Sequence, residues 1–116
     1  MLRIMCKSKI HRARITKVDL HYEGSIGIDK GLLKVSNIHP NEIVQVVNIN
    51  NGARFETYAI EEPSGSGAIS LYGAAAHLGK VGDLVIIFSY GLVDDRRSKR
   101  LKLKVVQVDS MNKILK

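Results

Sequence analysis

Apolar and polar residues alternate with a period of two along most of the chain, a pattern typical of strands with one buried face. Leu2, Ile4 and Cys6 share one face of the first predicted strand. The same pattern predicts further strands over residues 13–22, 25–29, 42–50, 53–61, 68–72, 84–90 and 101–108. A series of short strands in a single short chain predicts a mainly β fold, a closed or nearly closed small β-barrel.

Polar and glycine-containing segments between the strands predict turns and two short helices. Asn51-Gly52 joins two alternating runs and tolerates the positive φ angles of a tight hairpin turn. Asp29 can cap a brief helix over residues 30–35, because its carboxylate accepts hydrogen bonds from free backbone N–H groups. Residues 73–78 predict a second helix of one or two turns that ends at Gly79. Residues 94–100 are predicted to form a charged loop.

Length and composition favour one globular domain in a reducing compartment. The chain has 116 residues and 45% hydrophobic content, which suits a single core. No apolar run approaches the roughly 18 residues of a membrane helix, and the N-terminus has no secretory signal pattern. The single cysteine, Cys6, cannot form an internal disulfide. We therefore expect a cytoplasmic protein.

The net charge of +7 is concentrated in two blocks, residues 1–17 and residues 96–104. Such blocks attract nucleic acid or small anions, or they simply form a solvated surface. Neither block contains an aromatic residue for base stacking. A non-catalytic small basic β-barrel that binds nucleic acid is therefore the alternative function.

Residues 54–58 offer a binding and proton-transfer surface. Arg54 and Tyr58 lie on one face of their predicted strand, and Thr57 lies on the other. An arginine can hold a carboxylate through two parallel hydrogen bonds, and a tyrosine can donate a proton. An exposed strand face with an ordinary cross-strand partner would show the same pattern. The histidines are scattered and no Cys/His spacing resembles a metal site, so no metal is expected.

Two glycine-containing segments could also carry chemistry. The backbone of Gly73, Ala74 and Ala75 can face an anion, although small residues there could equally serve close packing. Gly24-Ser25 lies between apolar extended runs, where glycine permits strained backbone angles. The serine hydroxyl could attack the preceding carbonyl and convert the amide into an ester. The alternative is a β-bulge or a tight turn.

Five motifs in order resemble the aspartate 1-decarboxylase family, pyruvoyl-dependent enzymes that make β-alanine for pantothenate and hence coenzyme A biosynthesis. The resemblance covers residues 1–90 and fades through the basic tail. The motifs that carry it are Lys9-Ile-His-Arg12, Tyr22-Glu-Gly-Ser25 with Ile28-Asp29, Asn51-Gly-Ala-Arg-Phe-Glu-Thr-Tyr58, Gly73-Ala-Ala-Ala-His77 and Val81-Gly-Asp-Leu-Val-Ile-Ile87.

The resemblance implies a double-psi β-barrel and a homotetramer with active sites between subunits. It also implies an inactive proenzyme, or zymogen, that cleaves itself between Gly24 and Ser25. The products would be residues 1–24 (the β chain) and 25–116 (the α chain). An N-to-O acyl shift onto the Ser25 hydroxyl, elimination to dehydroalanine and hydrolysis with loss of ammonia would leave a covalent pyruvoyl group.

By the same resemblance the mature protein is a carboxy-lyase with no external cofactor and no metal. The pyruvoyl group from Ser25 would form a Schiff base with L-aspartate and accept electrons as CO2 leaves. Tyr58 matches the proton donor. Thr57 matches the threonine that holds the Gly24 carbonyl during cleavage and lies beside the substrate.

The resemblance further assigns the substrate carboxylates to Lys9, Arg54 and the backbone of Gly73, Ala74 and Ala75. It brings His11 and Tyr22 near the same pocket, without a defined role. The expected substrate is a small molecule, and neither nucleic acid nor a membrane is expected as a partner.

Tyr72 departs from the family, which commonly has asparagine just before Gly-Ala-Ala-Ala. That asparagine helps to order the cleavage site. We predict that Tyr72→Asn cleaves as fast as the unaltered chain or faster. Markedly slower cleavage would show that Tyr72 is an adapted replacement. A relative that never cleaves and acts as a scaffold is the third alternative.

Overall fold

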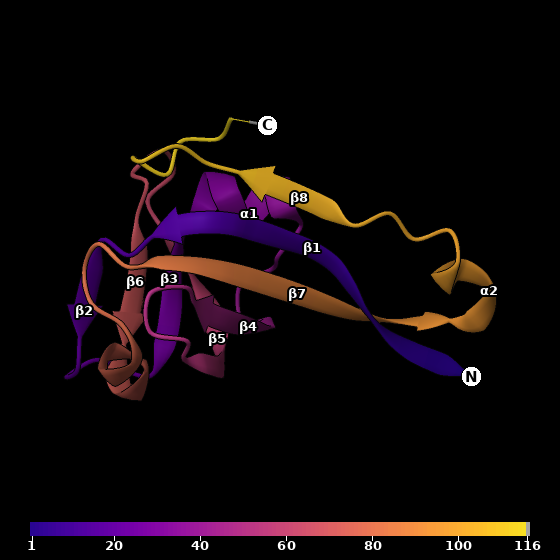
Figure 1. Ribbon diagram of the computed structural model, residues 1–116, viewed down its shortest axis with the longest axis horizontal. Helices are drawn as coiled ribbons and strands as arrows, with labels where there is room; N and C mark the ends of the chain where they lie inside the picture. The colour runs from indigo at the N-terminus through magenta and orange to yellow at the C-terminus, as the bar shows by residue number, and fades with distance from the viewer. Residues whose placement is uncertain (116) are drawn as a thin grey trace.

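The computed structural model describes residues 1–115, which form eight strands and three short helices (Figure 1). The elements, in chain order, are β1 (Leu2–Arg14), β2 (Lys17–Asp19), β3 (Ser25–Asp29), α1 (Lys30–Ser36), β4 (Ile43–Asn48), β5 (Arg54–Glu62), β6 (Ile69–Tyr72), the 3-10 helix η1 (Gly73–Leu78), β7 (Leu84–Asp94), α2 (Asp95–Ser98) and β8 (Lys104–Gln107). The prediction of a mainly β fold is confirmed, and the structure is consistent with a small β-barrel.

The strands are hydrogen-bonded in the order β2-β6-β3-β5-β4-β7-β1-β8. Strand β3 pairs in parallel with β5 and antiparallel with β6, so both of its edges are covered. Alternate side chains on the strands point inward and pack with α1. The fully buried large side chains are Ile10, Ile15, Ile26, Ile28, Leu32, Ile69, Leu71, Ile87, Val44, Val46, Val85 and Val106.

The hairpin and the first helix form as predicted. Strands β4 and β5 meet at a turn in which Gly52 has a φ of +77° and Asn48 N donates to Ala53 O at 2.8 Å. Asp29 caps α1 by accepting from Gly31 N at 2.7 Å. None of the helices within residues 1–115 has the length and apolarity that crossing a membrane requires.

Strand β1 is longer than the sequence pattern predicts. It continues through Arg14, where the pattern placed the start of a second strand at residue 13. An irregularity in its pairing with β7 falls between Ile10 and Ala13, and Arg12 has a φ of +61° there. This irregularity changes the alternation without ending the strand, which explains why the pattern suggested two strands.

The first half of β1 and the last half of β7 form a two-stranded arm that projects from the barrel (Figure 1). The predicted charged loop over residues 94–100 is wrong in part, because α2 forms at the tip of this arm. Asp94 caps α2 by accepting from Arg97 N at 3.0 Å. The prediction overlooked that an aspartate can cap a helix as short as one turn.

Candidate active site

The cleavage junction predicted from the sequence lies where β3 begins. Ser25 is the first residue of β3 and is paired with Tyr72 on β6. On the other side, Ile26 is paired with Ala59 of β5. Ser25 and Tyr58 each lie one residue before this pair on their two parallel strands. Ser25 is therefore flanked by a tyrosine-bearing strand on each side.

The hydroxyl of Ser25 is directed back along the chain. Ser25 has no exposed surface, and its Oγ donates to Glu23 O at 3.0 Å. The Gly24 carbonyl lies in the chain between these two groups. The hydroxyl is thus hydrogen-bonded to the residue that precedes the Gly24–Ser25 pair.

Gly73 packs its backbone directly against Gly24. Its φ is +66°, and a Cβ added there would lie 2.7 Å from Gly24 Cα and 2.8 Å from Gly24 N. Only glycine allows this approach without strain. In η1, which begins at this residue, Ala74 is exposed and Ala75 is buried. The predicted anion-binding turn is therefore next to the junction.

Thr57 and Tyr58 are both half-buried on β5. Thr57 is paired with the buried Val44, and Tyr58 with the exposed Ile43. The two side chains therefore point to opposite faces, as the sequence pattern predicted. Within residues 1–115 the structure contains no hydrogen bond between the Thr57 side chain and Gly24.

Arg54 is exposed at the start of β5 and is held from one side. Its Nη1 donates to Gln45 Oε1 at 2.9 Å, and Tyr90 donates its hydroxyl proton to the same oxygen at 2.6 Å. The remaining N–H groups of a guanidinium can still face a carboxylate.

Lys9 lies on β1 with its Nζ 5.9 Å from the centre of the Phe88 ring, and Phe88 stacks on Tyr90. Lys9 and Arg54 thus contact one continuous layer of side chains. In the strand order, however, β7, β4 and β5 lie between Lys9 and Ser25. The strand that carries Lys9 is therefore not hydrogen-bonded to the strand that carries Ser25.

His11 and Tyr22 differ in their surroundings. His11 Nδ1 is buried without a hydrogen-bond partner among residues 1–115. Burial, and then the charges of Lys9 and Arg12, lower the pKa of His11. Tyr22 is more than half exposed, yet its ring lies 4.7 Å from the Tyr72 ring, measured between centroids.

Tyr72 makes contacts that sequence reasoning missed. Its hydroxyl donates to Glu62 Oε2 at 3.0 Å, and Ser70 Oγ donates to the same oxygen at 3.0 Å. A Cβ added to Gly27 would lie 2.8 Å from Glu62 Cδ and 3.0 Å from Tyr72 Cε2. Gly27 was the available signal, because a glycine inside a strand often marks a close approach.

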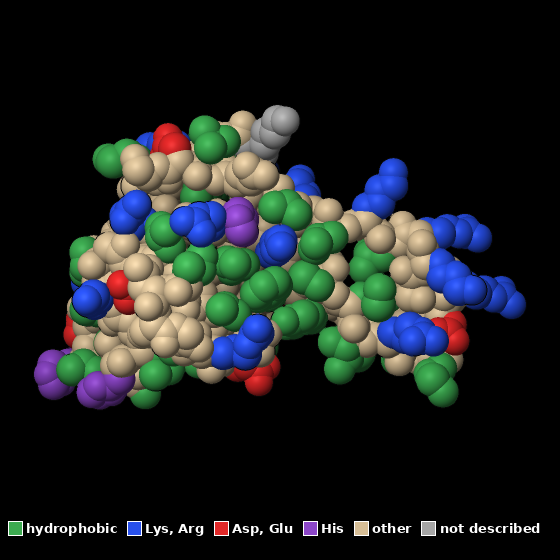
Figure 2. Space-filling model, in the orientation of Figure 1, with side chains coloured by type: hydrophobic (Ala, Val, Ile, Leu, Met, Phe, Trp, Pro, Cys, Tyr) green, Lys and Arg blue, Asp and Glu red, His purple; other side chains and the backbone are tan. Residues whose placement is uncertain are grey.

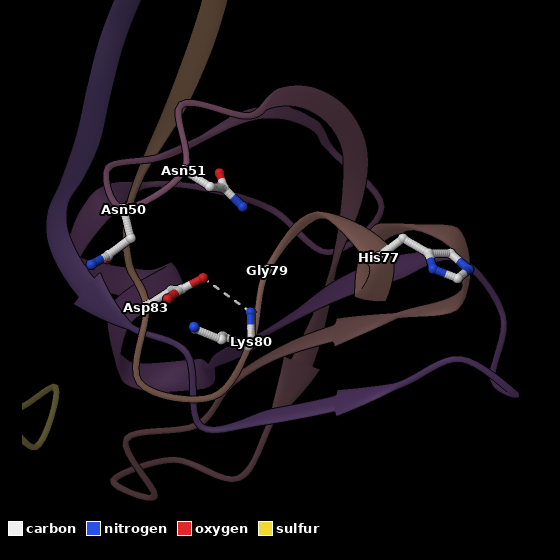
Figure 3. Close-up of a pocket in the computed structure, with 6 residues that line it drawn as sticks. All are labelled: Asn50, Asn51, His77, Gly79, Lys80 and Asp83. Atoms are coloured by element: carbon white, nitrogen blue, oxygen red, sulfur yellow. Dashed lines mark hydrogen bonds between the residues drawn. The ribbon is translucent and has the colours of Figure 1, made fainter.

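A separate depression of about 270 Å³ lies at the far end of η1 (Figure 3). Asp83 there accepts from Asn48 Nδ2 at 2.9 Å and from Lys80 N at 3.1 Å. His77 points away from this pair in Figure 3. The depression is lined by Asn50, Asn51, His77, Gly79, Lys80 and Asp83, none of which was a predicted site residue.

The structure also bears on a nucleophilic cysteine and on a metal site. Burial raises the pKa of the Cys6 thiol, which disfavours a reactive thiolate. Across residues 1–115, no three His, Cys, Asp or Glu side chains group closely enough to hold a metal ion.

The family model and the named relatives that match this chain are all aspartate decarboxylases. The sequence profile of the family described as "Aspartate decarboxylase" matches residues 1–115. A protein of Thermoanaerobacter pseudethanolicus named "Aspartate 1-decarboxylase" is 58% identical over 113 residues, 97% of each chain. Proteins with the same name from Carboxydothermus hydrogenoformans and Moorella thermoacetica are 58% and 54% identical. These two alignments cover 100% and 98% of this chain, and 91% and 89% of the relatives.

Proposed function

Because this chain belongs to the aspartate decarboxylase family, we propose that it converts L-aspartate into β-alanine and CO2 in the cytoplasm, for pantothenate biosynthesis. The observation that carries the proposal is the match over residues 1–115, which includes the Gly24–Ser25 junction and the strands on both sides of it. The unpaired Cys6 agrees with a reducing compartment.

The chain matures by cutting itself between Gly24 and Ser25. Ser25 Oγ attacks the Gly24 carbonyl carbon, the C–N bond breaks, and an ester forms. Elimination releases the Gly24 carboxylate and leaves dehydroalanine, and water then yields a pyruvoyl group and ammonia. Two contacts support this step: the Ser25 hydroxyl is directed back toward Glu23, and Gly73 packs closely against the backbone of Gly24.

The pyruvoyl group supplies an electron sink for the bond to the departing carboxylate. Tyr58, on the strand beside Ser25, donates the proton to the carbon that has lost CO2. Arg54 binds a substrate carboxylate while Gln45 fixes one edge of its guanidinium. Thr57 holds the Gly24 carbonyl during cleavage, and the backbone of Gly73, Ala74 and Ala75 faces the anionic substrate.

Assembly into a homotetramer completes the site. Lys9 is distant from Ser25 in the strand order, so it would reach a substrate held by another subunit. The arm has an apolar face that is exposed in one chain, with Ile4 at 75% and Leu92 at 67% exposure. An exposed face of this kind is typical of an interface with another protein chain.

The nucleic-acid alternative is not favoured, because the matching family and the named relatives are decarboxylases. The second basic block has another setting: basic side chains gather at the end of the arm in Figure 2, and Arg96, Arg97, Lys99 and Arg100 lie in α2 or directly after it. A solvated or subunit-facing surface accounts for it.

Intact-mass spectrometry of the purified protein tests the proposal. We expect two fragments, residues 1–24 and 25–116, with the larger one lacking a free N-terminal amine, and CO2 release from L-aspartate. Ser25→Ala should abolish both cleavage and activity, while Ser64→Ala, at an exposed serine, should change neither. A chain that stays uncut after long incubation would refute the proposal and favour the scaffold alternative.

A further inference from the structure

The direction of the Tyr72 ring links β6 to the residues around Ser25. On the outer face of the sheet, Tyr72 is paired with Ser25, and the next pair along the strands is Ser70 with Gly27. The Tyr72 ring lies toward Gly27, as its close approach to the added Cβ at that glycine shows. It therefore points along the strand, away from the Gly24–Ser25 peptide.

Glu62 holds the ring in this direction. Its Oε2 accepts from both the Tyr72 hydroxyl and Ser70 Oγ, each at 3.0 Å. Glu62 is paired with Asp29 on β3, so its side chain shares the face of Gly27 and Tyr72. A carboxylate that accepts two hydroxyl protons is a stronger anchor than a neutral acceptor.

The same ring carries two groups from the segment that precedes the junction. Lys17 Nζ lies 5.5 Å from the centre of the Tyr72 ring, and the Tyr22 ring lies 4.7 Å from it. Tyr22 is separated from Ser25 by only two residues. Tyr72 is 6% exposed, so a change in its direction would displace these contacts.

We infer that Glu62 is a positioning residue for self-cleavage, which acts by fixing the Tyr72 ring over Gly27 and thereby holds Tyr22 and the Gly24–Ser25 peptide in place. The inference rests on the proposed function and deepens it. Glu62, Ser70 and the space above Gly27 together accommodate a bulky residue next to the junction. The tyrosine at position 72 therefore depends on these three neighbouring positions.

The test is the rate at which freshly purified precursor cleaves, followed by intact mass. Tyr72→Phe should slow cleavage about tenfold, the effect expected for losing one hydrogen bond to a charged group, and Glu62→Ala, which removes the same hydrogen bond and that from Ser70, should slow it at least as much. Glu62→Gln keeps an acceptor and should stay within about threefold of the unaltered chain. Glu61→Ala, at the exposed neighbour that pairs with Lys30, is the matched control and should cleave normally.

A double variant separates positioning from general stability. If Glu62 acts through the Tyr72 hydroxyl, Tyr72→Phe should add no further slowing to Glu62→Ala. The thermal unfolding of Tyr72→Phe and Glu62→Gln should stay close to that of the control, and their kcat per cleaved chain should be unchanged. Additive slowing in the double variant, or Glu62→Gln as slow as Glu62→Ala, would overturn the inference.

Failure of the inference differs from failure of the proposed function. If the unaltered chain never cleaves, the proposed function fails. If the unaltered chain cleaves and Glu62→Ala cleaves at the same rate, only the role of Glu62 is refuted. Should Glu62→Ala not fold, Tyr72→Phe and Glu62→Gln still decide the question, because both retain the volume of the replaced side chain.

Discussion

The start of β3 is enclosed by neighbouring residues, whereas the arm formed by β1 and β7 leaves apolar side chains exposed. Around Ser25 the backbone is covered on both edges, Gly73 packs against Gly24, and Tyr72 and Ser70 both donate to Glu62. On the arm, Ile4 and Leu92 are cross-strand partners that are largely exposed, and α2 closes the tip (Figure 1).

This difference suits two separate roles, one for the residues around Ser25 and one for the arm. The junction region fixes backbone atoms at close distance, which suits a reaction of the chain with itself. The arm leaves apolar area uncovered, which suits contact with another chain. We therefore expect substitutions near β3 to alter cleavage or folding, and substitutions on the arm to alter assembly.

Gly73→Ala should have the largest effect. The new Cβ would lie 2.7 Å from Gly24 Cα, and the φ of +66° adds strain, so we expect a loss of about 2–4 kcal/mol in folding stability together with strongly impaired cleavage. Gly52→Ala is the matched control: its φ is +77°, but nothing lies within 4 Å of the added Cβ. Equal cleavage rates in the two variants would contradict the importance of the close contact.

Asp29→Ala should come next, because one carboxylate anchors the loop between β5 and β6. It accepts from Gly31 N, Gly65 N and Gly67 N at 2.7, 3.0 and 2.8 Å. We expect urea denaturation to show a loss of about 2–3 kcal/mol. Asp109→Ala, whose carboxylate also accepts backbone N–H groups but is exposed, should cost less.

The pH dependence of stability should change with the same substitution. Burial raises the pKa of Asp29, but the hydrogen bonds from Gly67, Gly31 and Gly65 outweigh it and hold the pKa below its usual value of 3.8. The stabilisation is therefore complete above that usual value and is lost as the pH falls through the lower, folded pKa. In acid the unaltered chain should lose stability faster than Asp29→Ala, and parallel pH profiles would count against this assignment.

A paired change on the arm should leave the barrel intact and alter assembly. In Ile4→Ser/Leu92→Ser, we expect light scattering to give a smaller assembly, while cleavage continues because the junction contacts lie within one chain. Val81→Ser removes a comparably exposed apolar residue outside the arm and should leave the mass unchanged. An unchanged mass for the arm variant would show that this face is not an interface.

Arg3→Ala should have the smallest effect. The side chains of Arg3 and Asp95 form an ion pair and are 57% and 54% exposed. Solvent screens such a pair, so folding stability should change by less than about 0.5 kcal/mol. A loss several times larger, measured by urea denaturation, would mean that the tip of the arm contributes to the fold.

The sequence predicted those features of the fold that depend only on neighbouring residues. Asn51-Gly52 specified its hairpin, and Asp29 specified its helix cap, because each depends on residues within a few positions. Thr57 and Tyr58 were assigned to opposite faces by alternation alone. Which of these residues are brought to Ser25 was not readable from alternation.

Features that depend on distant pairing could not be predicted. Strand β1 continues past Arg12 because β7 continues opposite it, and the arm exists only as a pair. The contact of Glu62 with Tyr72 joins residues on strands separated by β3, so no spacing rule signals it. The sequence predicted that Asp29 caps α1, but not that its carboxylate also accepts hydrogen bonds from the backbone N–H groups of Gly65 and Gly67.

The place of β1 between β7 and β8 has a consequence for the mature protein. Strand β1 belongs to residues 1–24, whereas both of its neighbours belong to residues 25–116. Scission after Gly24 would turn an intramolecular fold into a heterodimer held by an interior strand. Unfolding would then depend on protein concentration, and a matured molecule that lost its short peptide on dilution could regain its shape only by recapturing one.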